Sequence, residues 1–183
     1  MIRLFVGLDI PNDVRDHVYS LRGGIPNTRW IDKENYHLVL RFIGNVTEDD
    51  AYRVHQELET VKYDSFNLAL TTLGTFKTGS YLRNMWLGVN NFHVLDGLND
   101  KVEKAVSRAG IAKDVRKFHA HVKVAKFNNA NPEKVNEYIM YNNLFKSRDF
   151  KVCYFCLFSS NPNKDGNGSF FKVERSYPLL NPF

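Results

Sequence analysis

Cysteines and long apolar runs are scarce in this chain of 183 residues, and no Pro- or Gly-rich linker interrupts it. Because no apolar run approaches the roughly 20 residues that span a bilayer, we expect no membrane-spanning helix. The first residues enter a strand-like pattern without the regions that make up a signal peptide, so a cytoplasmic location is expected. In the absence of a linker, residues 1–183 are expected to form a single two-lobed domain.

The two cysteines, Cys153 and Cys156, have the C-x-x-C spacing that redox and zinc sites use. They lie within residues 151–158, which read as a strand that would point them to opposite faces. No second C-x-x-C accompanies them, and no Gly-Pro turn lies between them. Two buried free thiols are therefore the favoured interpretation.

Apolar residues make up 43% of the chain and aromatic residues 14%, which indicates a globular protein rather than a disordered one. The formal net charge of +5 favours polyanionic partners. An ordinary basic surface would give the same charge, so composition alone leaves the function open.

Two stretches carry the strongest pattern, residues 36–44 (YHLVLRFIG) and residues 118–127 (FHAHVKVAKF). In each, a histidine opens a run whose side chains would alternate between two faces of a strand. In the first run, the expected cleft face holds His37, Val39 and Arg41, and the core face holds Leu38, Leu40 and Phe42. In the second run, the expected cleft face holds His121, Lys123 and Ala125, with His119 upstream, and the core face holds Val122 and Val124. Two such strands side by side would bring His37 and His121 into one cleft.

Two imidazoles in one cleft suit acid and base chemistry near neutral pH, because the ordinary pKa of histidine lies close to 7. We therefore expect His37 and His121 to be catalytic. His119 and His121 form an H-x-H pair that could alternatively bind zinc, but no third ligand is evident nearby, so no metal is expected. A structural role is the competing interpretation for any single histidine. The other three, in or at the start of expected helices, are most simply exposed to solvent: His17, His55 and His93.

Hydrophobic periodicity and turn residues predict the order of the elements. Strands are expected at residues 3–9, 28–32, 36–44, 66–76, 84–90, 118–127, 150–159 and 169–176. Helices are expected after Pro11, after Thr47, over residues 93–109 and after Asn131. Short turns between strands favour antiparallel sheets, so the predicted fold class is α+β.

The two runs resemble the paired His-x-Thr motifs of the two-histidine phosphoesterases. They are closest to those of the bacterial RNA 2',3'-cyclic phosphodiesterases, also called 2'-5' RNA ligases. That family typically has His-hydrophobic-Thr-Leu-x-Phe-Leu-Gly in its first half and Pro-His-Val-Thr-Leu-Ala-Arg in its second. This chain has HLVLRFIG at residues 37–44 and AHVKVAK at residues 120–126, and RLFVGLDIP at residues 3–11 adds a further match.

The resemblance covers nearly the whole chain in order. It implies two pseudo-symmetric lobes, each a mainly antiparallel sheet backed by helices, with a central cleft between the motif strands. It implies metal-independent hydrolysis of RNA 2',3'-cyclic phosphate to a 2'-phosphate end, with reversible 2'-5' ligation as a further activity. The expected partners are RNA or oligonucleotide ends with a cyclic phosphate, bound by a monomer that needs no cofactor.

The chain departs from the family at the groups that would bind phosphate. Val39 and Lys123 replace the two motif threonines, and Lys126 replaces the arginine after the second motif. Lys123 can donate to phosphate but Val39 cannot. Arg41 and Lys126 are expected to help, although Lys126 needs a twist or bulge to reach the face of His121. Because both threonines are missing, a non-catalytic or differently specific nucleotide-binding protein of the same fold is the alternative.

Overall fold

The computed structural model describes residues 1–183 as ten strands and four α-helices. The strands are β1 (Ile2–Asp9), β2 (Thr28–Trp30), β3 (His37–Val46), β4 (Phe66–Leu68), β5 (Leu70–Thr78), β6 (Tyr81–Val89), β7 (Val122–Phe127), β8 (Phe150–Val152), β9 (Tyr154–Pro162) and β10 (Ser169–Pro178). The helices are α1 (Asn12–Tyr19), α2 (Glu48–Glu59), α3 (Phe92–Arg108) and α4 (Pro132–Tyr141), and a 3-10 turn, η1, covers Lys33–Asn35.

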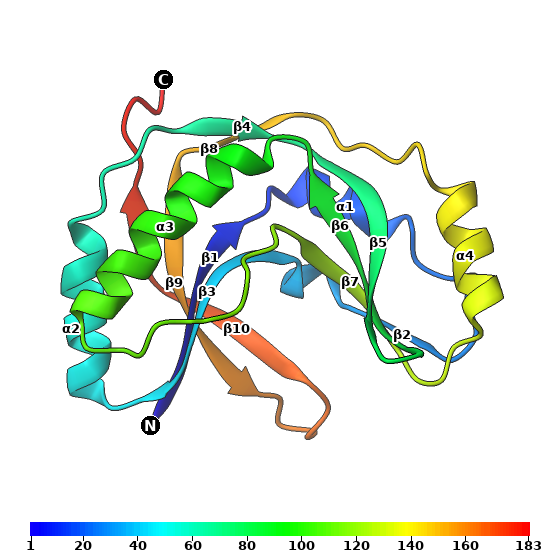
Figure 1. The fold of residues 1–183 in the computed structure, drawn as a ribbon, viewed down its shortest axis with the longest axis horizontal. Helices are drawn as coiled ribbons and strands as arrows, with labels where there is room; N and C mark the ends of the chain where they lie inside the picture. The colour runs from blue at the N-terminus through cyan, green and yellow to red at the C-terminus, as the bar shows by residue number, and fades with distance from the viewer.

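One eight-stranded sheet runs through the molecule in the order β10-β9-β1-β3-β7-β6-β5, with β2 beside β7. All of its strand pairs are antiparallel. Helices α2 and α3 lie with the β10-β9-β1-β3 half, and α1 and α4 lie with the β7-β6-β5 half (Figure 1). The predicted α+β class with two helix-backed lobes is confirmed. The two halves are joined through the pairing of Leu38 in β3 with Val122 in β7.

The helix starts follow the capping signals in the sequence. Thr47 precedes α2, and its hydroxyl accepts a hydrogen bond from the backbone N–H of Asp50 at 3.1 Å. Asn131 caps α4 in the same way, with Pro132 as the first helical residue. Helical spacing gathers the apolar side chains of α3 on one face, and these side chains are buried.

Three predicted strands differ from the structure, and in two of them the chain changes its pairing partner. Residues 66–76 divide at Ala69, and residues 150–159 divide at Cys153. The first part of each, β4 and β8, pairs with the other in a separate two-stranded sheet. The second motif strand begins at Val122 rather than at residue 118, so His119 and His121 lie on the segment that leads into it.

A cluster of 38 buried residues forms the main core and includes both Leu38 and Val122. Removing a buried leucine side chain costs about 2–5 kcal/mol of folding free energy, so truncating the side chains next to the motif histidines should destabilise the fold. Cys156 is a buried free thiol as predicted, whereas Cys153 is only partly buried because it lies between β8 and β9. None of the helices has the length and apolar character needed to cross a membrane.

Candidate active site

A cleft of about 1070 Å³ opens where β3 meets β7, and both motif histidines line it. Val39, Lys123 and Lys126 line the same cleft. The fold thus brings together, at one junction between its two halves, five of the positions that the sequence marks as candidates for chemistry.

His37 begins β3 and is almost enclosed, with 6% of its side chain exposed. The rings of Phe158 and Phe171 pack edge-on against it at centroid distances of 4.7 and 5.4 Å. Nε2 of His37 lies 3.3 Å from Nη2 of Arg15. Burial, and then the Arg15 cation, lower the pKa of His37 to about 4, while the Asp9 carboxylate acts in the opposite direction. His37 is therefore neutral at pH 7.

His121 directly precedes β7, and its Nδ1 lies 2.6 Å from the carbonyl oxygen of His119. A carbonyl can only accept, so Nδ1 carries the proton and Nε2 of the neutral ring keeps a lone pair. Burial lowers the pKa of His121, the bond to the His119 carbonyl opposes this, and the charges of His119 and Lys123 lower it further. His121 is thus held in one tautomer with one nitrogen available to a substrate.

An aromatic wall stands beside His121. The ring of Phe76 lies 5.0 Å from the His121 ring and 5.3 Å from the His119 ring, measured between centroids. The Trp86 ring lies 4.6 Å from that of His119. Nε1 of Trp86 and Oδ1 of Asn84, on the same strand, are buried without a hydrogen-bond partner. These two polar atoms lie inside the protein, so what the wall presents to the cleft is the apolar ring of Phe76.

A β-bulge in β7 brings Lys126 into the cleft. The register with β6 shifts between Lys123 and Ala125, so that Val124 is an extra residue in the strand. An extra residue reverses the alternation beyond it, and both lysines line the cleft. Burial, and then the charge of Lys126, lower the pKa of Lys123.

A second bulge directs the side chain of Arg41 toward Glu103 of α3. The register between β1 and β3 shifts at Leu40, so the alternation reverses there. The guanidinium of Arg41 pairs with Glu103 of α3 and donates to two backbone carbonyls. Phe42, predicted to face the core, is instead 51% exposed and lines the cleft. The regular alternation predicted to carry Arg41 onto the face of His37 is therefore broken, but Arg41 still lines the same cleft, with its donors occupied by Glu103 and backbone carbonyls.

Three charged residues near the histidines were missed by the sequence patterns. Arg29 of β2 pairs with Lys126 of β7 across the sheet and lines the cleft. Asp9 lies opposite His37 in the β1–β3 register, and Arg15 of α1 contacts both. The place of Asp9 at the end of the first strand is the one signal that could have pointed to this corner.

The loop between α3 and β7 gives the cleft a basic rim. Lys113, Arg116 and Lys117 line the cleft and are exposed. Arg116 pairs with Asp114 at 2.8 Å, and its guanidinium carbon lies 5.9 Å from the ring centroid of Phe42. Cationic and aromatic surface thus continues from the histidines to the edge of the cleft.

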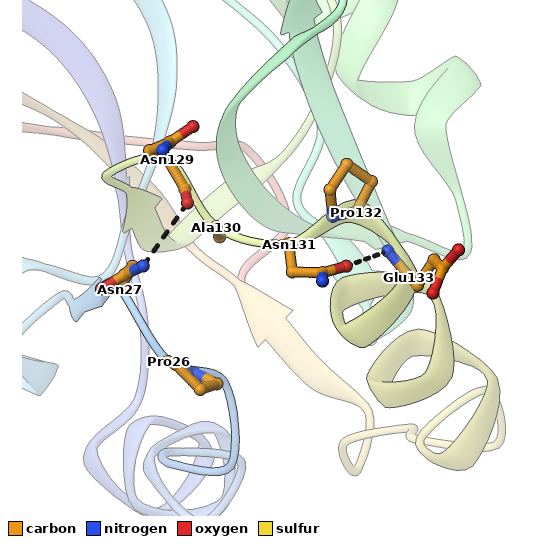
Figure 2. Close-up of a pocket in the computed structure, with 7 residues that line it drawn as sticks. All are labelled: Pro26, Asn27, Asn129, Ala130, Asn131, Pro132 and Glu133. Atoms are coloured by element: carbon orange, nitrogen blue, oxygen red, sulfur yellow. Dashed lines mark hydrogen bonds between the residues drawn. The ribbon is translucent and has the colours of Figure 1, made fainter.

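A smaller hollow of about 570 Å³ lies elsewhere, at the start of α4 (Figure 2). Its lining residues are Pro26, Asn27, Asn129, Ala130, Asn131, Pro132 and Glu133. The amides shown in Figure 2 serve the fold, because Asn131 caps the helix by accepting from the N–H of Glu133 at 2.8 Å and Asn27 donates to the Asn129 carbonyl at 3.5 Å. No histidine and no cation lines this hollow.

The H-x-H pair has no third metal ligand beside it. The His119 and His121 rings are 5.4 Å apart between centroids, and no group of three or more His, Cys, Asp or Glu side chains is arranged to hold a metal ion. The donor set at this end of the cleft therefore suits acid–base chemistry better than metal ligation.

Comparison with known proteins finds relatives of one kind. The model of a family described as LigT like Phosphoesterase matches residues 8–86. An RNA 2',3'-cyclic phosphodiesterase of Archaeoglobus fulgidus is 28% identical over 135 residues, which span 72% of this chain and 76% of that protein. Another, of Aeropyrum pernix, is 32% identical over 108 residues, which span 58% of this chain and 61% of that protein.

Solved structures with a similar fold have related names. A crystal structure of E. coli LigT complexed with 3'-AMP superposes with a TM-score of 0.79 at 20% identity, covering 98% of both chains. A structure described as a phosphoesterase superposes with a TM-score of 0.80 and covers 97% of this chain. The resemblance to the two-histidine phosphoesterases stated from the motifs is confirmed, and so is the predicted fold class.

Proposed function

We propose that this protein, which resembles the LigT-like phosphoesterases in sequence and in fold, hydrolyses RNA 2',3'-cyclic phosphate ends to 2'-phosphates without a metal. The observation that carries the proposal is the meeting of His37 and His121 in one cleft whose walls supply Lys123 and Lys126. Relatives named RNA 2',3'-cyclic phosphodiesterases support the substrate class.

The reaction needs one imidazole to accept a proton and one to donate a proton. The base takes a proton from water, whose oxygen forms a bond to phosphorus while the bond from phosphorus to O3' breaks. The acid protonates O3', and the phosphate stays on O2'. Each positioned proton transfer contributes about 10²–10⁴ to the rate. Attack by a 5'-hydroxyl in place of water would form a 2'-5' bond, so the same groups would serve ligation.

The basic side chains would hold the phosphate while charge develops on its oxygens. Lys123 lies two residues beyond His121 and is half-buried, so its ammonium acts on the anion with little screening by water. Lys126 adds a second, more exposed cation. Arg41 contributes from the rim, because its donors already serve Glu103 and the backbone. An anion bound here also favours the protonated form of His121, as the acid role requires.

RNA is the polymer that we propose enters the cleft, and the E. coli LigT structure with 3'-AMP gives an example of a nucleotide bound by this fold. The ring of Phe76, which lines the cleft and packs against Trp86, suits stacking of an unpaired base. The proposal includes a role in RNA processing, a single domain over residues 1–183, a monomer and a cytoplasmic location.

The test is hydrolysis of a short oligonucleotide with a 2',3'-cyclic phosphate, in EDTA, with the product end identified by ³¹P NMR. His37→Ala and His121→Ala should each lose about 10²–10⁴ of the rate while remaining folded, and the exposed His93→Ala is the matched control. Inactivation by EDTA that zinc reverses would overturn the metal-independent mechanism. Substantial activity in either folded cleft variant would overturn the two-histidine mechanism.

A nucleotide-binding role without catalysis is the second candidate, and one observation favours it. Val39 lines the cleft at a motif position where the family has a hydroxyl, so no donor can reach the phosphate from there. If the wild-type chain retains the oligonucleotide in a filter or polarisation assay but leaves its cyclic phosphate intact, this second function replaces the first.

A further inference from the structure

A charged pair behind His37 is not accounted for by the hydrolysis itself. Asp9 ends β1 opposite His37, and Arg15 lies in the first turns of α1. Nη2 of Arg15 donates to Oδ1 of Asp9 and lies 3.3 Å from Nε2 of His37. Oδ1 of Asp9 is 3.9 Å from the same nitrogen. The three side chains thus form one compact cluster, in which only His37 lines the cleft.

The chemistry of the cluster constrains the imidazole. A guanidinium can only donate hydrogen bonds, so Nε2 of His37 faces Arg15 with a lone pair and not with a proton. Only 14% of the Arg15 side chain and 6% of the His37 side chain are exposed, so water screens this contact weakly. Phe158 and Phe171 cover the ring from β9 and β10. The charged groups that act on the ring are Arg15 from α1 and Asp9 from β1.

We propose that Arg15, fixed in place by Asp9, is a positioning residue that keeps His37 unprotonated. His37 is then the base of the reaction and His121 is the acid; to take the proton from water, Nε2 of His37 must exchange its contact with Arg15 for a contact with that water, because Nε2 holds the one lone pair of the neutral ring. The assignment of roles rests on the proposed hydrolysis, whereas the coupling between Arg15 and His37 does not. The guanidinium does not touch the substrate; it acts through the imidazole, and it favours return of the accepted proton to solvent after each turnover because it repels the imidazolium.

The coupling is tested by NMR titration of the histidine rings in the full chain. Arg15→Met removes the cation, so the titration midpoint of His37 should rise by at least about one pH unit, a tenfold gain in proton affinity. Asp9→Asn removes the anion but keeps an oxygen that accepts from Arg15, so the midpoint should fall. Arg15→Lys keeps the charge, and its midpoint should stay near that of the wild type. The exposed His93 serves as the internal reference in every spectrum.

Opposite shifts in the two variants are a result that a merely structural role would not give. Midpoints of His37 that move in the same direction, or that do not move, overturn the proposal. If Arg15→Met fails to fold, the wild type and the Arg15→Lys and Asp9→Asn variants decide the question. The proposal is overturned if wild-type His37 has the same titration midpoint as His93. It is also overturned if the His37 midpoint does not fall in Asp9→Asn.

The catalytic half is tested by the pH profile of kcat/KM. The acidic limb of the wild-type profile should have the same midpoint as the His37 titration. This limb should lie at higher pH in Arg15→Met and near its wild-type position in Arg15→Lys. A limb that stays fixed while the His37 midpoint moves would show that His37 is not the base. If the wild type is inactive although the midpoints shift as expected, the proposed hydrolysis fails and the coupling stands.

Discussion

Leu38 of β3 pairs with Val122 of β7, and this pair joins the two halves of the eight-stranded sheet. Both side chains are fully buried, and each residue directly follows a motif histidine. The junction between the two halves and the proposed acid–base pair therefore lie on the same two stretches of backbone. A site built on packed strands holds its groups more precisely than a site on loops.

Lys123 is expected to contribute more than Lys126 to holding the phosphate. In the antiparallel register of the junction, Lys123 lies across from His37, and it is the more buried of the two lysines. A hydrogen bond to a charged group contributes roughly 1.5–3 kcal/mol, so Lys123→Ala should slow hydrolysis by about ten- to a hundredfold, and Lys126→Ala by less. Steady-state kinetics measure both, with the exposed Lys62→Ala as control.

A silent Lys123→Ala variant would contradict this assignment and would mean that the cleft does not hold phosphate as the family motifs imply. A larger loss of rate in Lys126→Ala than in Lys123→Ala would show that Lys126, beyond the bulge, is the main residue that holds the phosphate. In either case a normal rate in Lys62→Ala shows that the loss of one positive charge is not itself responsible.

Val39→Thr is expected to raise the rate. Val39 lies across from His121 in the same register and lines the cleft, so a threonine of similar shape would direct a hydroxyl toward the bound phosphate. One neutral hydrogen bond is worth about 0.5–1.5 kcal/mol, which corresponds to an increase of about two- to tenfold. Val39→Ala, which changes the volume without adding a donor, is the matched control, and an equal gain in both variants would attribute the effect to space.

The sequence predicted the elements of this fold better than the faces of its strands. Helix starts at Thr47 and Asn131 and the two motif strands follow local signals that act within a few residues. The bulges at Leu40 and Val124 do not follow local signals. Leu40 and Val124 are ordinary aliphatic residues, and each becomes the extra residue of a bulge only because of how the neighbouring residues pair with the next strand.

Those two bulges change what the cations of β3 and β7 contact. The bulge at Leu40 turns Arg41 toward α3, and the bulge at Val124 turns Lys126 toward the histidines. Arg15 could not be found either, since its contact with His37 depends on how α1 packs at the end of β1. Pattern and resemblance therefore indicated the histidines and the lysines of the second motif, while Asp9, Arg15 and Arg29 required the three-dimensional arrangement.

The basic rim should distinguish a polymer from a mononucleotide. Lys113 and Lys117 line the outer part of the cleft, where nucleotides preceding the terminal one would lie. The double variant Lys113→Ala/Lys117→Ala should raise KM for an oligonucleotide several-fold but should change kinetics on a nucleoside 2',3'-cyclic phosphate little. The slope of log K against log salt should also decrease by about 0.7 for each lost phosphate contact.

The charge-matched control for the rim is Lys62→Ala/Lys151→Ala, whose positions are exposed and do not line the cleft. Equal effects of the two double variants on the oligonucleotide would show that net charge, and not the rim, attracts RNA. An equal loss on the mononucleotide would place the two rim lysines at the terminal phosphate instead.

The last prediction concerns stability in acid. The pKa of His37 is lowered from 6.5 to about 4 in the folded protein, by burial first and then by Arg15. The unfolded chain therefore binds a proton at His37 before the folded protein does as the pH falls. The contribution of His37 to stability is complete above about pH 6.5 and is lost as the pH falls toward 4. This one group should lower the free energy of unfolding by about 2 kcal/mol between pH 7 and pH 5.

Urea unfolding at pH 7 and pH 5 measures the effect in the wild type and in His37→Gln, which keeps a polar side chain but cannot titrate. The difference in unfolding free energy between the two pH values should be about 2 kcal/mol larger in the wild type than in His37→Gln. The exposed His93→Gln should behave like the wild type. The same pH dependence in wild type and His37→Gln would mean that His37 titrates alike in the folded and unfolded chains, in conflict with its burial against Phe158 and Arg15.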